Sequence, residues 1–98
     1  MIVPFGDKAT EALYHGRSTK DTRRLPADVR RVAVRKLDMI NAARVLLDLR
    51  SPPGNRLEAL RGRWRGFHSI RVNEQWRIVF RWSDSQAHDV RLIDYHKG

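Results

Sequence analysis

The sequence predicts an α+β fold in which N-terminal helices pack on a small antiparallel β-sheet. Two observations lead to this prediction. Apolar residues recur at spacings of three and four in the first half of the chain, and they alternate with polar residues in the second half. The halves meet at Ser51-Pro52-Pro53-Gly54-Asn55, a segment that neither a helix nor a central strand can cross. We expect one domain over residues 1–98, because 98 residues are too few for two.

The N-terminal half begins with a short segment and a short helix. Residues 2–5 are expected to form at most an edge strand, because Pro4 has no amide proton for a central ladder. Asp7 is a suitable N-cap for a helix over residues 8–14, and Gly16 is a suitable end for it. Residues 17–24 are polar and are expected to form a loop.

A longer helix is expected to begin at Leu25-Pro26-Ala27-Asp28, because proline fits a first helical turn and Asp28 complements the helix dipole. Its apolar stripe consists of Val29, Val32, Ala33, Leu37 and Ile40. Beyond Asn41-Ala42-Ala43 an apolar face resumes with Val45, Leu46 and Leu49. Two interpretations remain open, one long bent helix or a hairpin of two helices.

The C-terminal half is expected to form four strands, over residues 57–60, 67–72, 76–82 and 87–96. The loops at residues 73–75 and 83–86 are short and therefore require antiparallel neighbours. In the third strand the aromatic and apolar side chains of Trp76, Ile78, Phe80 and Trp82 are expected to face the core.

The register of the central hairpin brings two arginines together. If residues 73–75 form the loop, Val72 pairs with Trp76 and Arg71 lies directly opposite Arg77. Opposed like charges are normally unfavourable, so the pair indicates an anion site. Residues 56–81 contain seven cations and two acids, which strengthens this interpretation. The alternative is that long arginines spread into solvent, and Arg77 is in any case expected to be exposed.

The composition favours a polyanionic partner. The net charge is +9, and 16 of the 20 cations are arginine, whose guanidinium binds phosphates and carboxylates with two hydrogen bonds. A general preference for arginine on surfaces is the alternative. The chain has no cysteine, so disulfides, thiolate metal sites and cysteine nucleophiles are excluded. No apolar run suggests a transmembrane helix or a signal peptide, and we expect a cytoplasmic protein with no membrane association.

The chain ends with Asp94-Tyr95-His96, three side chains that can donate, accept or orient a proton. Strand alternation places Asp94 and His96 on one face and Tyr95 on the other. The alternative is a solvated chain end. The four histidines lack the spacing of a metal site, and none is expected.

Nearly the whole chain resembles the HigB-like toxins of the RelE/ParE superfamily, which are the toxins of bacterial toxin–antitoxin pairs. The matching segments are residues 25–43, residues 52–62, Ser69 to Trp82, and Val90 with Asp94-Tyr95-His96. The resemblance implies a RelE-like fold and the cleavage of mRNA in the A site of the 70S ribosome, without a cofactor. It also implies inhibition by a HigA-like antitoxin with a helix-turn-helix domain, so that operator DNA is bound only through the antitoxin complex.

The resemblance also implies roles for individual residues. Asp94, Tyr95 and His96 fall on the family's terminal catalytic group, Arg77 on an active-site arginine, and Arg61 on a basic position. Glu58 departs from the pattern, because some members have a catalytic histidine there. We expect His96 to be the principal acid–base, assisted by Asp94 or Glu58, Tyr95 to orient a nucleotide, and Arg77 with Arg61 to stabilise phosphate charge. The residues expected to bind RNA or its phosphates are Arg61, Arg63, Arg65, Arg71 and Arg81.

Two other functions remain open at this point. ParE-type relatives share the scaffold but inhibit a protein target and lack an acid–base group. A basic nucleic-acid-binding module would need only the charge, although the sequence lacks a helix-turn-helix.

Overall fold

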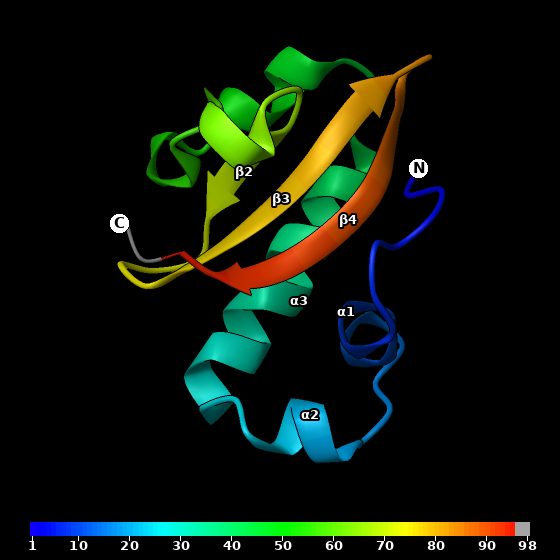
Figure 1. The fold of residues 1–98 in the computed structure, drawn as a ribbon, viewed down its shortest axis with the longest axis vertical. Helices are drawn as coiled ribbons and strands as arrows, with labels where there is room; N and C mark the ends of the chain where they lie inside the picture. The colour runs from blue at the N-terminus through cyan, green and yellow to red at the C-terminus, as the bar shows by residue number, and fades with distance from the viewer. Residues whose placement is uncertain (96–98) are drawn as a thin grey trace.

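The computed structural model describes residues 1–95, which form a helical layer on one face of a four-stranded antiparallel sheet (Figure 1). The strands lie in chain order across the sheet, β1-β2-β3-β4. Their bounds are β1 Glu58–Ala59, β2 His68–Arg71, β3 Trp76–Ser83 and β4 Gln86–Asp94. The α-helices are α1 Lys8–Tyr14, α2 Lys20–Arg23 and α3 Ala27–Ala42, and the 3-10 helices are η1 Leu46–Arg50, η2 Pro53–Asn55 and η3 Gly62–Trp64. The predicted fold class is confirmed.

Helix α1 has the predicted bounds and the predicted cap. The Asp7 carboxylate accepts a hydrogen bond from the backbone amide of Thr10 at 2.8 Å, which satisfies one of the unpaired amides of the first turn. Thr10 is buried, and its hydroxyl accepts a hydrogen bond from the backbone amide of Leu92 at 2.9 Å. The same turn therefore attaches α1 to β4.

Two helical segments differ from the prediction. Residues expected to be loop contain α2, which is capped by reciprocal hydrogen bonds between Thr19 and Thr22. Neither interpretation of residues 25–50 is correct, because α3 ends at Ala42 and Ala43 is extended. The chain then forms η1, in which Leu49 is buried and Leu47 is exposed, and Val45 just before it is also exposed.

The core lies between α3 and the sheet, with α3 behind β3 and β4 in Figure 1. Leu37 and Ile40 of α3 pack in one cluster with Ile70, Ile78 and Phe80 of the strands, and all five are fully buried. Alternation in β3 therefore directs Ile78 and Phe80 inward, as predicted, whereas Trp82 is only partly buried at the margin of this cluster.

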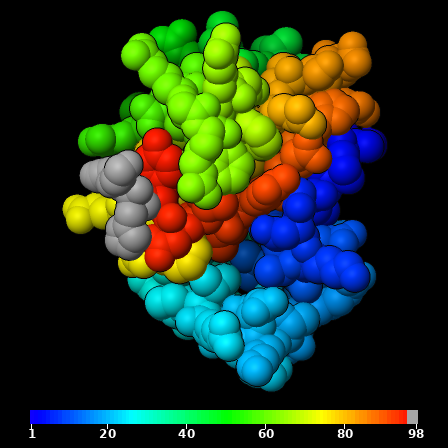
Figure 2. Space-filling view, in the orientation of Figure 1, coloured from blue at the N-terminus to red at the C-terminus, as the bar shows by residue number. Residues whose placement is uncertain are grey.

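The other face of the sheet is covered in part, which the sequence did not indicate. Val79 and Ser69 point to this face and are fully buried. The connection from β1 to β2 packs Trp64 against Phe67, and their ring centres lie 5.1 Å apart. It lies in front of the sheet in Figure 1, and Figure 2 shows it (lime) next to the end of β4 (red).

The first residues of the chain form no strand. They make two isolated parallel bridges to β4, Ile2 with Ala87 and Phe5 with Val90. Within residues 1–95 no helix is long and apolar enough to cross a membrane.

Candidate active site

Arg77 is the centre of a polar cluster on the sheet face that α3 leaves open. Its Nε donates a hydrogen bond to the Ser69 hydroxyl at 2.8 Å, and its Nη2 donates to the Arg56 carbonyl at 2.9 Å. The same Nη2 lies 3.3 Å from Glu58 Oε1. The side chain of Arg77 is 11% exposed and that of Glu58 is 53% exposed, so the prediction that Arg77 is exposed is wrong. These contacts hold the guanidinium in one orientation, because they engage two of its three nitrogens.

Arg71 lies directly opposite Arg77 in the β2–β3 ladder, as the register argument predicted. Tyr95 approaches from the end of β4, with its ring centre 5.6 Å from the guanidinium carbon of Arg77. A shallow cleft opens here, and its lining residues are Arg56, Arg71, Asn73, Glu74, Arg77 and Tyr95. Three arginines therefore gather around one opening.

Burial disfavours the charged form of Arg77, and the neighbouring charged groups act in both directions. Burial lowers the pKa of the Arg77 guanidinium below the usual value for arginine, and Arg71 and Arg56 act in the same direction. Glu58 and Tyr95 raise the pKa of this group and offset part of that effect. An arginine keeps its proton under such conditions, so the cluster retains a partly desolvated cation that favours an incoming anion.

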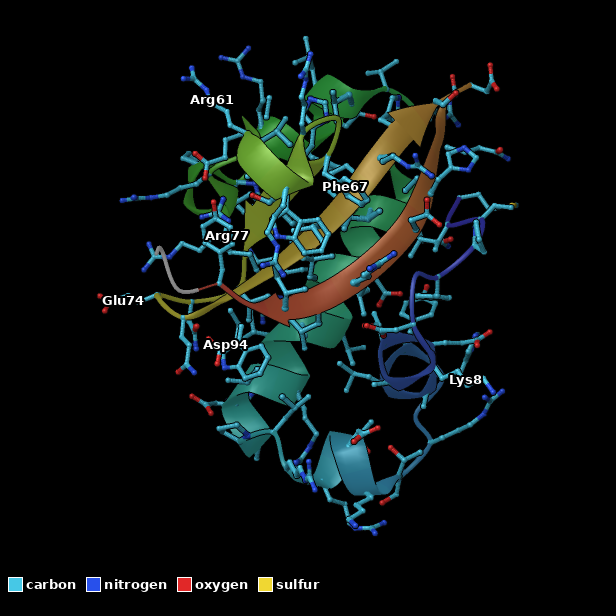
Figure 3. All side chains as sticks on the ribbon, in the orientation of Figure 1. Lys8, Arg61, Phe67, Glu74, Arg77 and Asp94 are labelled. Carbon is cyan, nitrogen blue, oxygen red and sulfur yellow. The ribbon has the colours of Figure 1, made fainter. Side chains whose placement is uncertain are left out.

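The terminal group is divided by the sheet. Asp94 pairs with Trp76 in the ladder, and its carboxylate accepts a hydrogen bond from the Gln75 side chain at 3.1 Å. Figure 3 shows Asp94 and Arg77 on opposite sides of the strand ends. Of the predicted catalytic residues, the structure therefore brings together Arg77, Glu58 and Tyr95, whereas Asp94 lies on the other side. His96 lies outside the described residues.

The predicted RNA-binding arginines occupy different environments. Arg71 lines the cleft, whereas Arg61, Arg63 and Arg65 are exposed on the connection from β1 to β2 (Figure 3 labels Arg61). Arg81 forms an ion pair with Asp89, and its guanidinium lies 5.5 Å from the ring centre of Phe67. Its contacts therefore place Arg81 with β4 and the β1–β2 connection, apart from the Arg77 cluster.

Sequence reasoning missed Ser69 and Arg56 as members of the site. Ser69 lies two residues before Arg71 and therefore shares its face of β2, and this spacing was a usable signal. Arg56 contributes its carbonyl from a left-handed backbone conformation, with φ of 47°, which nothing in its side chain indicates. Within residues 1–95 no three His, Asp or Glu side chains gather in a way that could hold a metal ion.

Comparison with known proteins adds independent information. The sequence model of a family described as the RelE-like toxin of type II toxin–antitoxin system HigB matches residues 4–96. Toxin HigB-1 of Vibrio cholerae is 42% identical over 97 residues, which are 99% of each chain. An uncharacterized protein of Haemophilus influenzae is 39% identical over 69 residues, covering 70% of this chain and 68% of that protein.

A solved structure of the YoeB–YefM complex from Staphylococcus aureus contains a similar fold. The TM-score is 0.62 over 98% of this chain and 95% of that chain. The sequences are only 19% identical, so this likeness concerns the fold alone.

Proposed function

This chain belongs to the HigB-like, RelE-like toxins of type II toxin–antitoxin systems, and we propose that it is a ribosome-dependent endoribonuclease that cleaves mRNA. The observation that carries the proposal is the half-buried Arg77, which Arg71 and Arg56 flank in an open cleft beside Tyr95. This cluster suits a phosphate that has an adjacent base.

RNA carries its own nucleophile, the 2′-hydroxyl, so the protein has to orient the backbone and stabilise charge. A phosphate in the cleft would contact Arg77 from the side that Ser69 and the Arg56 carbonyl leave open. Charge that develops on the phosphate oxygens is then stabilised by a cation that is already oriented and partly desolvated. Arg71 adds a second cation on the same face.

The proton transfers are assigned to the side chains around this phosphate. Glu58 is exposed and pairs only with one edge of Arg77, so a phosphate can displace it and leave its carboxylate next to the 2′-hydroxyl, whose proton it would accept. Tyr95 would stack on a base, with Arg77 beside its ring. We assign protonation of the leaving 5′-oxygen to His96, with Asp94 as its assistant from the other side of the strand end. Arg61, Arg63 and Arg65 would hold ribosomal RNA.

The proposed partners follow from the family and from the structural neighbour. That neighbour is a complex of YoeB with YefM, and we propose that this chain likewise binds an antitoxin, a HigA-like protein with a helix-turn-helix domain. Operator DNA would be bound only through that complex. The proposed site of action is the ribosome in the cytoplasm.

The test is cleavage of a defined mRNA in a reconstituted translation reaction, mapped by primer extension. The wild-type protein should cut the mRNA on ribosomes and leave the free mRNA intact. Arg77→Lys keeps the charge but loses the planar, two-pronged geometry, and it should cut about 100-fold more slowly. Arg44→Lys is the matched control, because Arg44 is exposed and outside the cleft, and it should cut like the wild type.

The other outcomes point to different proteins. Equal cleavage of free mRNA would indicate a nuclease that does not need the ribosome. An absence of cleavage in both reactions would favour a non-enzymatic inhibitor of the ParE type. Full activity of His96→Ala would contradict the assignment of the acid–base step.

A further inference from the structure

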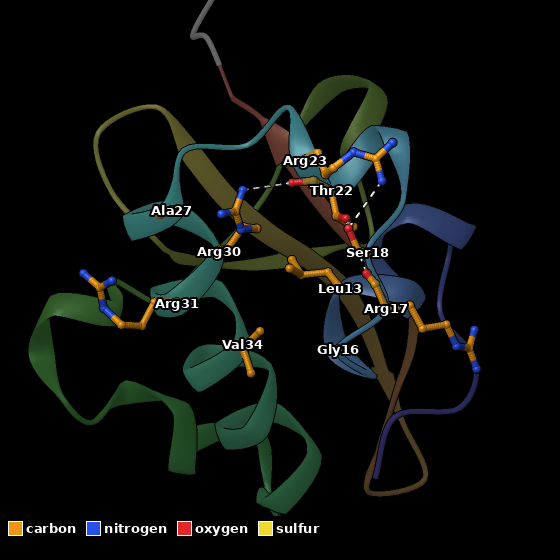
Figure 4. A pocket seen from close by; sticks show the side chains of 10 residues that line it. All are labelled: Leu13, Gly16, Arg17, Ser18, Thr22, Arg23, Ala27, Arg30, Arg31 and Val34. Carbon is orange, nitrogen blue, oxygen red and sulfur yellow. Dashed lines mark hydrogen bonds between the residues drawn. The ribbon is translucent and has the colours of Figure 1, made fainter.

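A second cleft lies on the helical layer, between α1, α2 and the first turns of α3 (Figure 4). Four arginines from three segments line it: Arg17, Arg23, Arg30 and Arg31. Its apolar lining consists of Leu13, Ala27 and Val34. The helices cover the sheet face opposite to Arg77, so this cleft and the Arg77 cluster belong to different layers of the molecule.

The charges of this cleft are not compensated inside the described part of the chain. The two ion pairs within residues 1–95 involve Arg77 and Arg81, and neither is in this cleft. Arg30 donates to the carbonyls of Thr22 and Leu25, and Arg23 donates to the Ser18 hydroxyl at 3.4 Å. All of these acceptors are neutral, so the positive charge of the cleft remains available to an external anion.

Arg17 and Arg31 are the members of the cleft with the greatest freedom. Both are exposed, and within the described residues neither guanidinium has a hydrogen-bond or ion-pair partner. Asp21 and Asp28 lie nearby in the sequence, but neither pairs with a cleft arginine. These two arginines are therefore able to bind an external anion without breaking a contact of the fold.

The chemistry of the lining favours a peptide over single-stranded RNA. Single-stranded RNA is held by aromatic stacking beside cations, and no lining residue of this cleft is aromatic. Leu13, which is 6% exposed, forms with Val34 an aliphatic floor for which an RNA backbone has no matching group. A protein segment with an apolar side chain between carboxylates matches both the floor and the rim.

We propose that this cleft is an anchoring site for an acidic, amphipathic segment of the antitoxin. Carboxylates of that segment pair with Arg17 and Arg31, and an apolar side chain packs on Leu13 and Val34. The inference rests on the proposed antitoxin partner, but it does not depend on the cleavage chemistry. Because the Arg77 cluster lies in the other layer, the anchor binds without covering Arg77.

The test compares two double charge reversals that change the net charge equally. Arg17→Glu/Arg31→Glu alters the cleft, and Arg35→Glu/Arg44→Glu alters exposed arginines outside it. The probe is the HigA-like antitoxin of the proposed pairing, purified and titrated by calorimetry. The cleft variant should bind at least tenfold more weakly, and the control variant should change by less than threefold. Melting curves check that both variants are folded.

A third variant separates the cleft from general electrostatics. Ala27 is exposed in the lining, and Ala27→Trp fills the cleft without a change of charge. This variant should also bind the antitoxin at least tenfold more weakly. Unchanged binding of Ala27→Trp, or equal weakening by both double reversals, would overturn the proposal.

Ribosome-dependent cleavage is measured in parallel, with the free toxin. The cleft variants should cut mRNA like the wild type, and a loss of cleavage with unchanged antitoxin binding would show an RNA surface instead. If the wild type does not cut but the cleft variants lose antitoxin affinity, the anchoring site stands and the nuclease proposal falls. If the wild type cuts and all variants bind the antitoxin normally, the nuclease proposal stands and the anchoring site falls.

Discussion

The guanidinium of Arg77 is oriented by acceptors of two kinds. Ser69 and the Arg56 carbonyl are neutral, and they fix the direction of the group without neutralising it. Glu58 supplies the one carboxylate that pairs with it, from an exposed position. A half-buried cation with a removable counter-ion is a suitable receptor for a phosphate, because the protein does not have to reorganise when the phosphate arrives.

Ser69 is accordingly predicted to be a positioning residue. Ser69→Ala removes the acceptor of Arg77 Nε and should lower the cleavage rate by roughly tenfold, because the guanidinium gains freedom. The measurement is a double-mutant cycle with Arg77→Lys, which lacks this hydrogen bond. In the Arg77→Lys background, Ser69→Ala should have no further effect on the rate. Additive losses would show that Ser69 acts on stability and not through Arg77.

Gly6 illustrates a different constraint on a single residue. A Cβ at this position would lie 2.3 Å from Arg91 Nε and 2.7 Å from the Asp89 carbonyl, and the backbone carbonyl cannot move aside cheaply. Gly6→Ala should therefore lower the free energy of unfolding by about 1–3 kcal/mol. Gly54→Ala is the control, because a Cβ there meets nothing within 4 Å, and it should be neutral or stabilising by up to about 1 kcal/mol. Urea denaturation measures the free energy of unfolding of both variants. Equal stability of Gly6→Ala and Gly54→Ala would contradict the predicted clash.

At the scale of elements, the sequence predicted those parts that a local signal specifies. Helix α1 followed from its Asp7 cap, and the opposition of Arg71 and Arg77 followed from the length of one loop. Helix α2 has four residues and no apolar period, and it depends on the reciprocal caps of Thr19 and Thr22, which periodicity cannot reveal.

The candidate site was predictable to the same extent. Arg71, Arg77 and Tyr95 share a face by strand alternation, which the sequence contains. The Arg56 carbonyl and the cover provided by Trp64 and Phe67 depend on the path of long connections, and no periodic pattern describes such paths. For this reason the sequence predicted an exposed Arg77, whereas most of its side chain is buried in the structure.

Lys36 joins α3 to the segment that precedes β1. Its ammonium group is buried and donates to the Asn55 side chain, and Asn55 in turn donates to the carbonyls of Leu49 and Ser51. Burial lowers the pKa of Lys36 below the usual value for lysine, and Arg35 acts in the same direction. A neutral acceptor satisfies this ammonium group geometrically but does not compensate its charge.

The stability of this junction should depend on pH. The folded pKa of Lys36 is depressed, so the folded state loses this proton at a lower pH than the unfolded chain does. The penalty for the buried charge is complete below the folded pKa and is relieved as the pH rises through it towards the unfolded value. The free energy of unfolding of the wild type minus that of Lys36→Met should consequently be larger at pH 10 than at pH 8. Urea denaturation of both proteins at the two pH values measures this difference, in which the contributions of the other titrating groups cancel. The same difference at pH 8 and pH 10 would contradict the prediction.

At the scale of the whole molecule, the charge of +9 is distributed over both layers. Residues 1–50 contain eleven cations and six acids, and residues 56–81 contain seven cations and two acids. The described residues form two ion pairs, so most of this charge is uncompensated in the free protein. Such a molecule loses stability through self-repulsion and recovers it when an anion binds.

Arg71→Gln tests this trade between stability and binding. The substitution removes the like charge opposite Arg77 and should raise the free energy of unfolding by about 0.5 kcal/mol, which corresponds to roughly 2–4 °C in Tm. The same substitution weakens the anion site. When phosphate replaces chloride at equal ionic strength, the Tm of Arg71→Gln should rise less than that of the wild type.

Arg44→Gln serves as the control in the same thermal scans, because Arg44 is exposed and outside the cleft. Phosphate also stabilises proteins generally through exclusion from their surfaces, and this contribution is common to the three proteins. The specific contribution is therefore the part of the Tm increase that Arg71→Gln loses and Arg44→Gln keeps. If the three proteins respond equally to phosphate, the opposed arginines are not an anion site, and the repulsion between them has no role in binding.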